Sequence, residues 1–510
     1  MAVLDKPAAG ARGAARGGLA NMAGSALAGG TGVAVTWIVA RSLGAEQAGA
    51  FFAATAAFVL AGGLAKLGTQ TGLVYWPARL RATGRTHLLG ACLRTGLIPV
   101  MVLSVVLAVA MWLAAPAIAR LTAGESAHVV GAHTAGLRVL ALFLPLQAMT
   151  DALLTATRGY RAMRPTVTLD RLLRSGMQLG LVGLAGVTAL WTAASLPMFA
   201  LAWAAPYLPV TILSAYALRR LYREAKAPGG TTRRAERSAL RREFWRFTGP
   251  RAIASVAQQA LQRIDVLLVA AFGGLIAAAV YAVAGRFVVL IQFANQGISQ
   301  SVQPRLAEAL AVGDRRAAND LYQTATGWLV LVTWPVNLLV IFFAPMWLRL
   351  FGDRYAAEGV AVVAVLAGAM LVATGCGMVD MVLAMAGRTS WNLVNVLVAL
   401  AVTVVLDVLL IPRYGALGAA IGLACSMVVN NLLPLIQVGR SAGLHPFGRG
   451  TRAAGLLAVT CFGVLPWCLT AVSLGRTSAV LVAVPVFLAG AWLLRVPLAL
   501  DAFKPMRRTS

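Results

Sequence analysis

Long apolar runs separated by short polar segments dominate this chain. A run of about 20 apolar residues is long enough to cross a bilayer as an α-helix. Lipid offers no partner to an exposed strand edge, and the alternating ten-residue strands of an outer-membrane barrel are not found in the sequence. The pattern predicts an all-α integral membrane protein with about 14 transmembrane helices, near residues 18–40, 48–72, 91–115, 133–157, 171–192, 196–218, 249–272, 277–301, 321–346, 357–384, 390–411, 416–439, 453–473 and 477–496.

Two halves of the chain repeat each other at an offset of about 230 residues. The segment V39-A-R-S-L-G-A-E-Q-A-G-A-F-F-A-A54 is echoed by V269-A-A-F-G-G-L-I-A-A-A-V-Y-A-V-A284, with Gly44 matched by Gly274. Further on, Asp151 is matched by Asp380, each within an apolar run. A repeated helix bundle is typical of secondary transporters, which handle the substrate between the repeats.

Composition and charge narrow the class further. The 510 residues are 59% hydrophobic and 12% charged, with a mean hydropathy of +0.79, more apolar surface than a soluble fold can bury. The formal net charge is +27, but the arginines are spread over short loops rather than gathered in one patch, which disfavours a nucleic-acid interface. With the N-terminus inside, 34 of the 44 basic residues fall in cytoplasmic segments and 7 in external ones. We therefore expect a multi-pass protein of the cytoplasmic membrane with both termini in the cytoplasm.

The repeat and the loop charges predict a division of the chain into two six-helix repeat lobes and a C-terminal helical hairpin. The long loop after the sixth helix is rich in arginine; it is interpreted as a topogenic linker, with contact to the anionic inner leaflet or to a partner enzyme as the alternative. The expected parts are a cytoplasmic tail (1–17), an N-lobe of helices 1–6 (18–218), a basic linker (219–248), a C-lobe of helices 7–12 (249–440), an extra hairpin (441–497) and a cytoplasmic tail (498–510).

The sequence contains no recognisable motif for a metal site, a disulfide bond or a nucleotide-binding site. All five cysteines lie in or beside apolar runs without a C-x-x-C, and the four histidines form no cluster with ligand spacing. The chain has no G-x-x-x-x-G-K-[ST] motif and no D-x-D. We therefore expect no catalytic residues, no metal and no cofactor, and we do not expect an enzyme.

Several motifs resemble the polysaccharide and oligosaccharide flippases (Wzx-like proteins) of the multidrug/oligosaccharidyl-lipid/polysaccharide exporter superfamily. The resemblance covers roughly residues 15–440, in the order and spacing of the predicted helices. It is carried by V39-A-R-S-L-G-A-E-Q-A-G-A-F-F, A65-K-L-G-T-Q-T-G-L, I264-D-V-L-L-V-A-A-F-G-G, V280-Y-A-V-A-G-R286, L350-F-G-D-R-Y355 and L409-L-I-P-R-Y-G-A-L-G-A-A420.

This resemblance implies two lobes that face a central cavity and move a lipid-linked sugar from the inner to the outer leaflet by alternating access. The chain departs from the family pattern at Asp407, where a neutral polar residue is expected. The arginine pattern of the peptidoglycan-precursor relatives is not recognised in the first two helices, which makes lipid II a poorer substrate than another glycolipid. The resemblance implies that the protein binds the phosphate or pyrophosphate headgroup of the lipid-linked sugar and membrane lipid. Polysaccharide-assembly enzymes are partners in one alternative.

Charges deep in the predicted helices are the candidate site residues, because ionisable groups inside a membrane are costly and usually functional. Arg263, Arg286 and Lys66 are predicted to bind the substrate phosphate in the cavity, since fixed cations suit that group. On a continuous helix Arg263 and Asp265 point about 200° apart, so Arg286 is the expected neighbour of one of them. The alternative is an Arg–Asp pair that only locks two helices together.

Three carboxylates, Asp265, Asp380 and Asp151, are the candidates for ion coupling. Asp151 is expected to pair with Lys66 inside the N-lobe. The position that matches Lys66 in the second half is Asn295 or Gln296, so Asp380 is expected to lack that cation. A buried carboxylate without a cation can exchange a proton or hold sodium; snorkelling of the Asp380 side chain toward Arg388 is the alternative.

Three classes of function are compatible with a helical membrane protein of this kind. The favoured one is a flippase or exporter of a lipid-linked oligosaccharide or polysaccharide precursor. A drug or small-molecule exporter of the same superfamily is an alternative, although such exporters usually have twelve helices, and a lipid II flippase is another. A membrane glycosyltransferase or polymerase is less favoured, because the external loops are short and acidic catalytic motifs are not found.

Overall fold

The computed structural model describes residues 6–123, 127–225, 233–286, 298–299, 302–303, 305–473 and 475–498. All regular structure in these residues is helical, and the expected all-α fold is confirmed. Eleven helices of the described chain are long and apolar enough to cross a membrane. The chain forms two compact units, Met1–Val283 and Ala284–Ser510.

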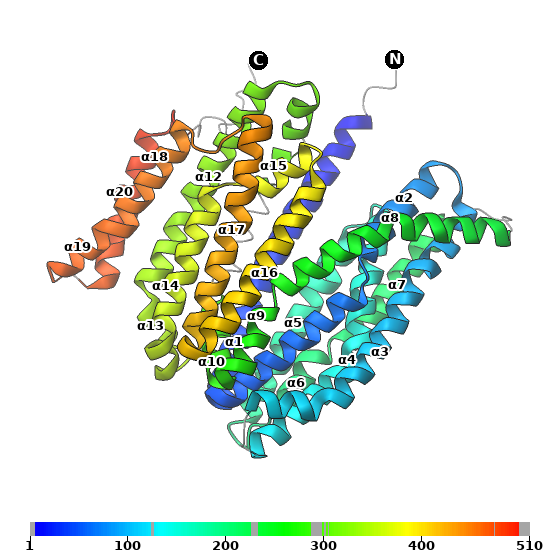
Figure 1. The fold of residues 1–510 in the computed structure, drawn as a ribbon, viewed down its shortest axis with the longest axis horizontal. Coiled ribbons are helices and arrows are strands. Elements are labelled where there is room, and N and C mark those ends of the chain that lie inside the picture. The colour runs from blue at the N-terminus through cyan, green and yellow to red at the C-terminus, as the bar shows by residue number, and fades with distance from the viewer. Residues whose placement is uncertain are drawn as a thin grey trace. The chain divides into compact units, whose positions relative to one another are not determined.

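The first unit holds the helices before residue 284. Figure 1 shows α3 and α4 side by side in this unit. Its helices are α1 (Lys6–Ala65), α2 (Thr69–Ala82), η1 (Thr86–Leu88), α3 (Leu89–Ala123), α4 (Ala127–Gly159), the π-helix η2 (Thr166–Arg174), α5 (Ser175–Thr188), α6 (Leu196–Ala204), α7 (Tyr207–Ala225), α8 (Arg234–Leu261), α9 (Ile264–Leu268), the π-helix η3 (Val269–Gly273) and α10 (Gly274–Ala284).

The second unit is built on α12, α14, α16 and α17, and α16 lies beside α17 (Figure 1). The C-terminal helices pack against α12 through Cys461, Phe462 and Ala483, so the expected extra hairpin is joined to the bundle. The helices are α12 (Arg315–Phe342), α13 (Ala344–Arg349), α14 (Asp353–Gly375), α15 (Val379–Met385), α16 (Thr389–Tyr414), α17 (Ala416–Ala442), α18 (Arg449–Ala458), the π-helix η4 (Val459–Val464), α19 (Leu465–Ala471) and α20 (Arg476–Leu493).

The predicted spans fall mainly on helical segments where the structure describes them, and breaks at 66–68, 262–263 and 376–378 interrupt three of them. Eleven apolar helices are found rather than 14 because some spans are joined or short: Leu27–Ala65 contains most of the first predicted span and most of the second, and α5 has only 14 residues. Most of span 277–301 lies outside the described residues, as do the tail beyond residue 498 and part of the basic linker. The lobe boundaries at 218 and 249 stay a prediction; α8, α9 and most of α10 belong to the first compact unit.

The repeat is visible in the backbone at Gly44 and Gly274. Gly44 has φ 73° and ψ 171° where α1 bends, and Gly274 has φ 83° and ψ 171° between η3 and α10. Only glycine adopts this region without strain. The segments after the two bends also touch: a Cβ on Gly49 would lie 1.8 Å from the carbonyl oxygen of Leu275. The repeated sequence therefore encodes the same helix-to-helix bend twice.

Alanine at either bend is expected to destabilise the protein by about 1–3 kcal/mol. Apart from the adjacent chain, no atom of the described residues lies within 4 Å of a Cβ built on Gly44 or Gly274, so the penalty comes from the backbone conformation. Thermal unfolding in detergent of Gly44→Ala and Gly274→Ala measures it. Gly30→Ala is the matched control, since Gly30 lies within α1 with equally open space and no positive φ. Equal midpoints for all three variants would contradict the assignment.

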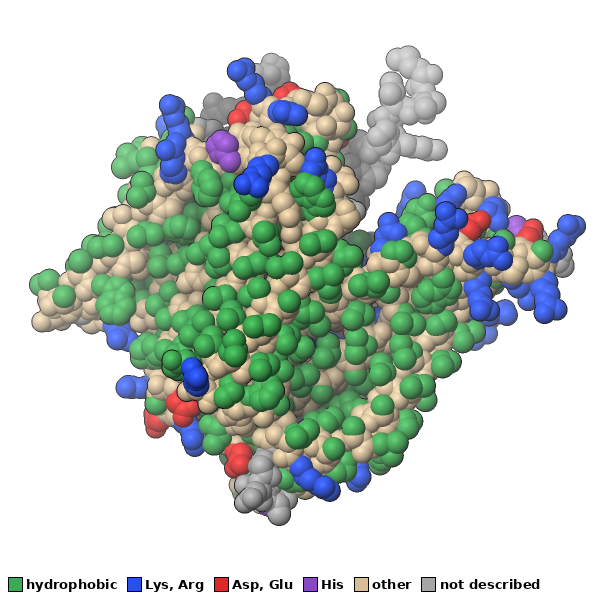
Figure 2. Space-filling model, viewed as in Figure 1, with side chains coloured by type: hydrophobic (Ala, Val, Ile, Leu, Met, Phe, Trp, Pro, Cys, Tyr) green, Lys and Arg blue, Asp and Glu red, His purple; other side chains and the backbone are tan. Residues whose placement is uncertain are grey.

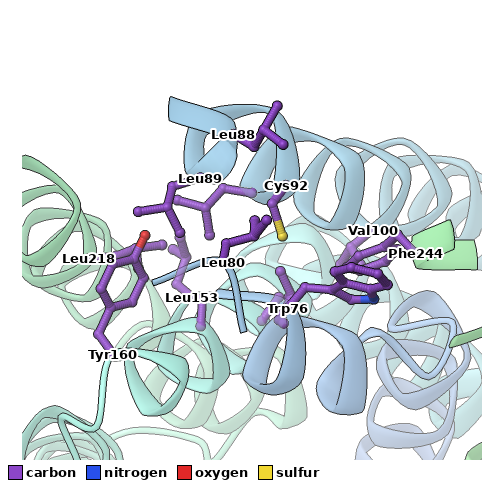
Figure 3. Close-up of a cluster of buried hydrophobic side chains, with 14 of the residues drawn as sticks. Trp76, Leu80, Leu88, Leu89, Cys92, Val100, Leu153, Tyr160, Leu218 and Phe244 are labelled. Carbon is purple, nitrogen blue, oxygen red and sulfur yellow. The ribbon is translucent and has the colours of Figure 1, made fainter. Parts of the chain in front are cut away.

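The surface and core agree with a membrane location. Figure 2 shows hydrophobic side chains spread over the visible face of the helix bundles. On α3 the exposed side chains include Val102, Val106 and Leu113, at 58%, 55% and 72% exposure. Such an apolar surface is suited to lipid rather than to water. Inside the first unit, a hydrophobic core joins α2, α3, α4, α7 and α8 around Trp76, Leu89 and Phe244 (Figure 3).

Candidate functional site

Breaks in helices place the first candidate cation. Between α1 and α2 the chain leaves the helix at Lys66–Gly68, where Leu67 has φ 48° and Gly68 has φ 66°. A Cβ on Gly68 would lie 2.5 Å from the Cα of Ala252, so glycine also allows α8 to approach this break. Irregular backbone at membrane depth is tolerated only where it is buried in protein or lines a water-filled space. The break is therefore a place where a polar site can form.

Lys66 and Asp151 form the ion pair that the sequence predicts. The Lys66 Nζ lies 2.8 Å from the Asp151 Oδ2, and the side chains are 9% and 31% exposed. Asp151 comes from the last third of α4, a helix that also packs on α1. A close ion pair offsets the cost of taking the ammonium group out of water.

Arg263 lies at a second helix break, and this changes its relation to Asp265. Helix α8 ends at Leu261, Arg263 has φ −137°, and α9 begins at Ile264. The expectation that Arg263 and Asp265 point 200° apart assumed one continuous helix, which the backbone does not form here. The two side chains interact electrostatically. Arg263 is half-buried, and Asp265 is 5% exposed.

The carboxylate of Asp265 is held by its own unit. The hydroxyl of Tyr281, on α10, donates to Oδ2, and the N–H of Val266 donates to Oδ1 at 2.9 Å. Tyr281 follows the glycine bend at Gly274, so the repeated segment supplies the group that orients Asp265. The sequence gives no signal for this contact, because it depends on η3 and α10 folding back on α9.

A group of polar residues that the sequence analysis missed lies on η2. Asp170 accepts a hydrogen bond from the Arg174 Nε at 2.7 Å, and the Arg171 Nε lies 3.6 Å from its other oxygen. The Arg174 guanidinium also donates to Gln178 and lies 5.3 Å from the ring centroid of Tyr207. In the sequence these arginines count only among the basic residues of the cytoplasmic segments. The i, i+4 spacing of Asp170 and Arg174 was the available signal.

Electrostatic interactions, most of them without a direct contact, relate these groups to one another within the first unit. Arg158, on α4, interacts with Asp151, Asp170 and Arg171. Tyr207, on α7, interacts with Arg174 and with Arg263. We call the set the polar cluster; it comprises Lys66, Asp151, Arg158, Asp170, Arg171, Arg174, Tyr207, Arg263, Asp265 and Tyr281.

The polar cluster carries a formal excess of two positive charges, because it has five cationic side chains and three carboxylates. Asp170 holds two of its guanidiniums, those of Arg171 and Arg174, by ion pairs. Its cationic side chains are half-buried or buried, which weakens screening by salt. Such an arrangement is suited to a multiply charged anion, and a planar guanidinium can bind two phosphate oxygens at once.

Two other predicted site residues belong to the second unit. Arg286 is half-buried beyond the end of α10. Asp380 lies on the short helix α15, exposed rather than buried as expected, just after a break at Cys376–Met378 where the Tyr322 hydroxyl donates to the Cys376 carbonyl at 2.6 Å. Within the described residues the carboxylate of Asp380 forms no ion pair, and Arg388 instead stacks on Trp391 at 4.3 Å. Asn295 and Gln296 lie outside the described residues.

Comparison with solved structures identifies the class of fold. The lipid II flippase MurJ in an inward closed conformation aligns with a TM-score of 0.71 and 13% identity, covering 94% of this chain and 99% of that one. An inward-facing multidrug resistance MATE family transporter of the MOP superfamily aligns at 0.64 and 15% identity, covering 81% and 94%. A MOP superfamily transporter from Pyrococcus furiosus aligns at 0.54 and 15%, covering 84% and 95%. The chain therefore has the fold of these membrane transporters rather than that of a membrane enzyme.

At the level of sequence, the MatE family model matches residues 250–409, a stretch that begins in α8 and ends in α16. No curated protein sequence matches the chain.

Proposed function

We propose that this protein is a flippase that moves a lipid-linked oligosaccharide or polysaccharide precursor from the inner to the outer leaflet of the cytoplasmic membrane by alternating access. The observation that carries the proposal is the excess of positive charge in the polar cluster. A lipid-linked sugar bears a phosphate or pyrophosphate, and fixed arginines are the side chains that hold such a group best. Lys66 and Arg263 are assigned to that phosphate.

The same charge balance argues against a cationic drug as the main substrate. A half-buried group of residues with net positive charge repels a cation and attracts a phosphate. The extent of structural similarity points the same way, since the alignment with the MurJ flippase covers 94% of this chain and that with the multidrug transporter 81%. A chain that adds a two-helix hairpin to the twelve helices of an exporter would show such a difference in coverage.

Two other substrates have specific observations in their favour. Lipid II is favoured by the similarity to a lipid II flippase, and a small molecule by the MatE family match. Both share alternating access with the proposal, so the substrate rather than the mechanism separates them.

Ion coupling is assigned to the carboxylates, and the orientation follows the loop charges. Asp380, which has no ion pair in the described part of the chain, is our first candidate to exchange a proton or hold sodium; Asp151 and Asp265 are held by Lys66 and Tyr281. We place both termini in the cytoplasm, as 34 of 44 basic residues then face inward. Binding to polysaccharide-assembly enzymes through residues 219–248 stays a prediction.

Reconstituted transport tests the proposal. Purified full-length protein in liposomes is supplied with a fluorescent polyprenyl-pyrophosphate oligosaccharide, with fluorescent lipid II, or with a fluorescent cationic drug, and the fraction that reaches the opposite leaflet or lumen is measured. We expect flipping of the oligosaccharide lipid at least about tenfold faster than in protein-free liposomes. Drug accumulation without flipping of either lipid would overturn the proposal in favour of an exporter.

A further inference from the structure

Aromatic rings and arginines form a stack where α2 packs on α8. The ring of Tyr75 stacks on that of Phe247, with centroids 4.4 Å apart and planes 18° apart. The Arg251 guanidinium lies 4.0 Å from the Phe247 centroid and donates to the Phe247 carbonyl at 2.7 Å. The Arg79 guanidinium donates to the Tyr75 hydroxyl at 3.1 Å and lies 5.3 Å from the ring of Trp76. We call Tyr75, Arg79, Phe247 and Arg251 the aromatic–arginine stack.

The stack is accessible, and its charge is not neutralised within the unit. Tyr75 is 40% exposed, and Arg79 and Arg251 are exposed. Neither arginine has a carboxylate partner in the part of the chain that the structure describes. Their neighbours are rings and one backbone carbonyl, which orient the guanidiniums but leave their positive charge available.

Rigid packing holds the stack in position. Trp76, next to Tyr75, is 3% exposed and belongs with Phe244 to the hydrophobic core of Figure 3. Glycine allows the two helices to approach: a Cβ on Gly72 would lie 2.4 Å from the Thr248 Oγ1. The stack therefore rests on a close helix contact and does not depend on freely moving surface side chains, so little entropy is lost when a ligand binds.

The position of the stack along α2 connects it to the polar cluster. Arg79 lies about 15 Å along the axis of α2 from Thr69, the first residue of that helix. Lys66 lies just before Thr69 in the chain. The predicted orientation places this end of α2 at the cytoplasmic surface. Figure 2 shows Lys and Arg side chains gathered over the end of the first unit that α2, α7 and α8 form. One helix therefore links an exposed cationic stack at the surface with the cation of the deeper cluster.

We infer that the aromatic–arginine stack is a second binding site, which captures the phosphate-bearing headgroup of a lipid-linked sugar at the inner leaflet before the polar cluster receives it. The inference rests on the proposed function. Arg79 and Arg251 bind the phosphate oxygens, and the exposed part of the Tyr75 ring packs against the apolar face of the sugar or the first isoprene unit. Capture at the surface raises the local concentration of substrate, and the stack itself takes no part in the transport step across the membrane.

Binding to the intact protein tests the site. Full-length protein in nanodiscs of neutral phosphatidylcholine is titrated calorimetrically with farnesyl pyrophosphate, a polyprenyl pyrophosphate without sugar, and separately with inorganic pyrophosphate. We expect the R79Q/R251Q double variant to bind farnesyl pyrophosphate at least about tenfold more weakly than the wild type, as befits the loss of charge-assisted hydrogen bonds. R79K/R251K retains the charge but loses the planar fork and is expected to bind a few-fold more weakly.

R85Q is the matched control, because Arg85 is an exposed arginine of the same end of the unit and contacts no aromatic ring among the described residues. Equal weakening by R85Q, or competition by phosphatidylglycerol as strong as by farnesyl pyrophosphate, would reduce the stack to general surface charge and overturn the site. A protein that binds inorganic pyrophosphate but does not bind farnesyl pyrophosphate would overturn the capture of a membrane substrate.

Transport kinetics separate this inference from the proposed function. In reconstituted flipping, R79Q/R251Q is expected to raise KM about tenfold and leave the maximal rate unchanged, as for uniform binding lost outside the transport step. An unchanged KM with active flipping would overturn the capture site and leave the flippase proposal standing. A wild-type protein that flips no lipid would instead refute the flippase itself.

Discussion

Replacing Arg263 by alanine is expected to abolish transport while membrane insertion stays normal. The side chain lies at the break between α8 and α9, half-buried, where it interacts with Asp265 and Tyr207. Loss of one charge-assisted, two-point contact with a phosphate weakens binding by about 10–100-fold, and the loss also removes half of the excess positive charge of the polar cluster. Delivery of the sugar to the surface of cells complemented with Arg263→Ala measures the effect, with protein abundance in the membrane measured alongside.

A matched arginine separates this role from a general requirement for intramembrane charge. Arg138, on α4, is also half-buried and also contacts an aromatic ring, that of Trp112 at 5.4 Å, but it is not part of the polar cluster. Arg138→Ala is expected to transport normally. Normal delivery by Arg263→Ala would refute its binding role, and equal loss in both variants would assign Arg263 to structure.

Removing Asp151 is expected to destabilise the first unit more than removing its partner Lys66. Asp151→Ala leaves the Lys66 ammonium, 9% exposed, without a counter-ion, at an expected cost of about 3 kcal/mol. Lys66→Met leaves a carboxylate that is 31% exposed and retains some solvation, so we expect a loss of about 1 kcal/mol. Thermal unfolding of the purified protein in detergent gives the order of the two variants.

The double variant tests whether the effect comes from the ion pair itself. Lys66→Met/Asp151→Ala removes both charges and is expected to be more stable than Asp151→Ala alone, since no uncompensated ammonium group remains. Additive losses in the double variant would show that the two residues act independently of each other.

The sequence predicted the helical segments and their internal symmetry because both depend on local pattern. Apolar runs of membrane length predict helices whatever their neighbours are, and Gly44 and Gly274 stand at equivalent places of the repeat because both bends need the same backbone conformation. The Lys66–Asp151 pair could also be predicted, since an isolated cation and an isolated carboxylate at similar depth each need a partner.

Other parts of the site could not be predicted, for two reasons. A helix break such as that at Arg263 leaves the hydrophobic pattern unchanged while it redirects the side chains on either side, so an angle calculated for a continuous helix does not apply to Arg263 and Asp265. Arginines near a helix end, such as Arg171 and Arg174, have the composition of a topogenic loop whether they face water or the protein.

The sequence by itself determined the membrane class, the helices, the repeat and the deep charges, because each can be recognised from the pattern of residues within segments of a few tens of residues. Only the tertiary structure decided which charges act together. It brought α4, η2, α7 and the α8–α9 break around one excess of positive charge, and it stacked Tyr75 of α2 on Phe247 of α8. These contacts join residues far apart in the chain, and they depend on the turns, breaks and glycine contacts that set how the helices pack.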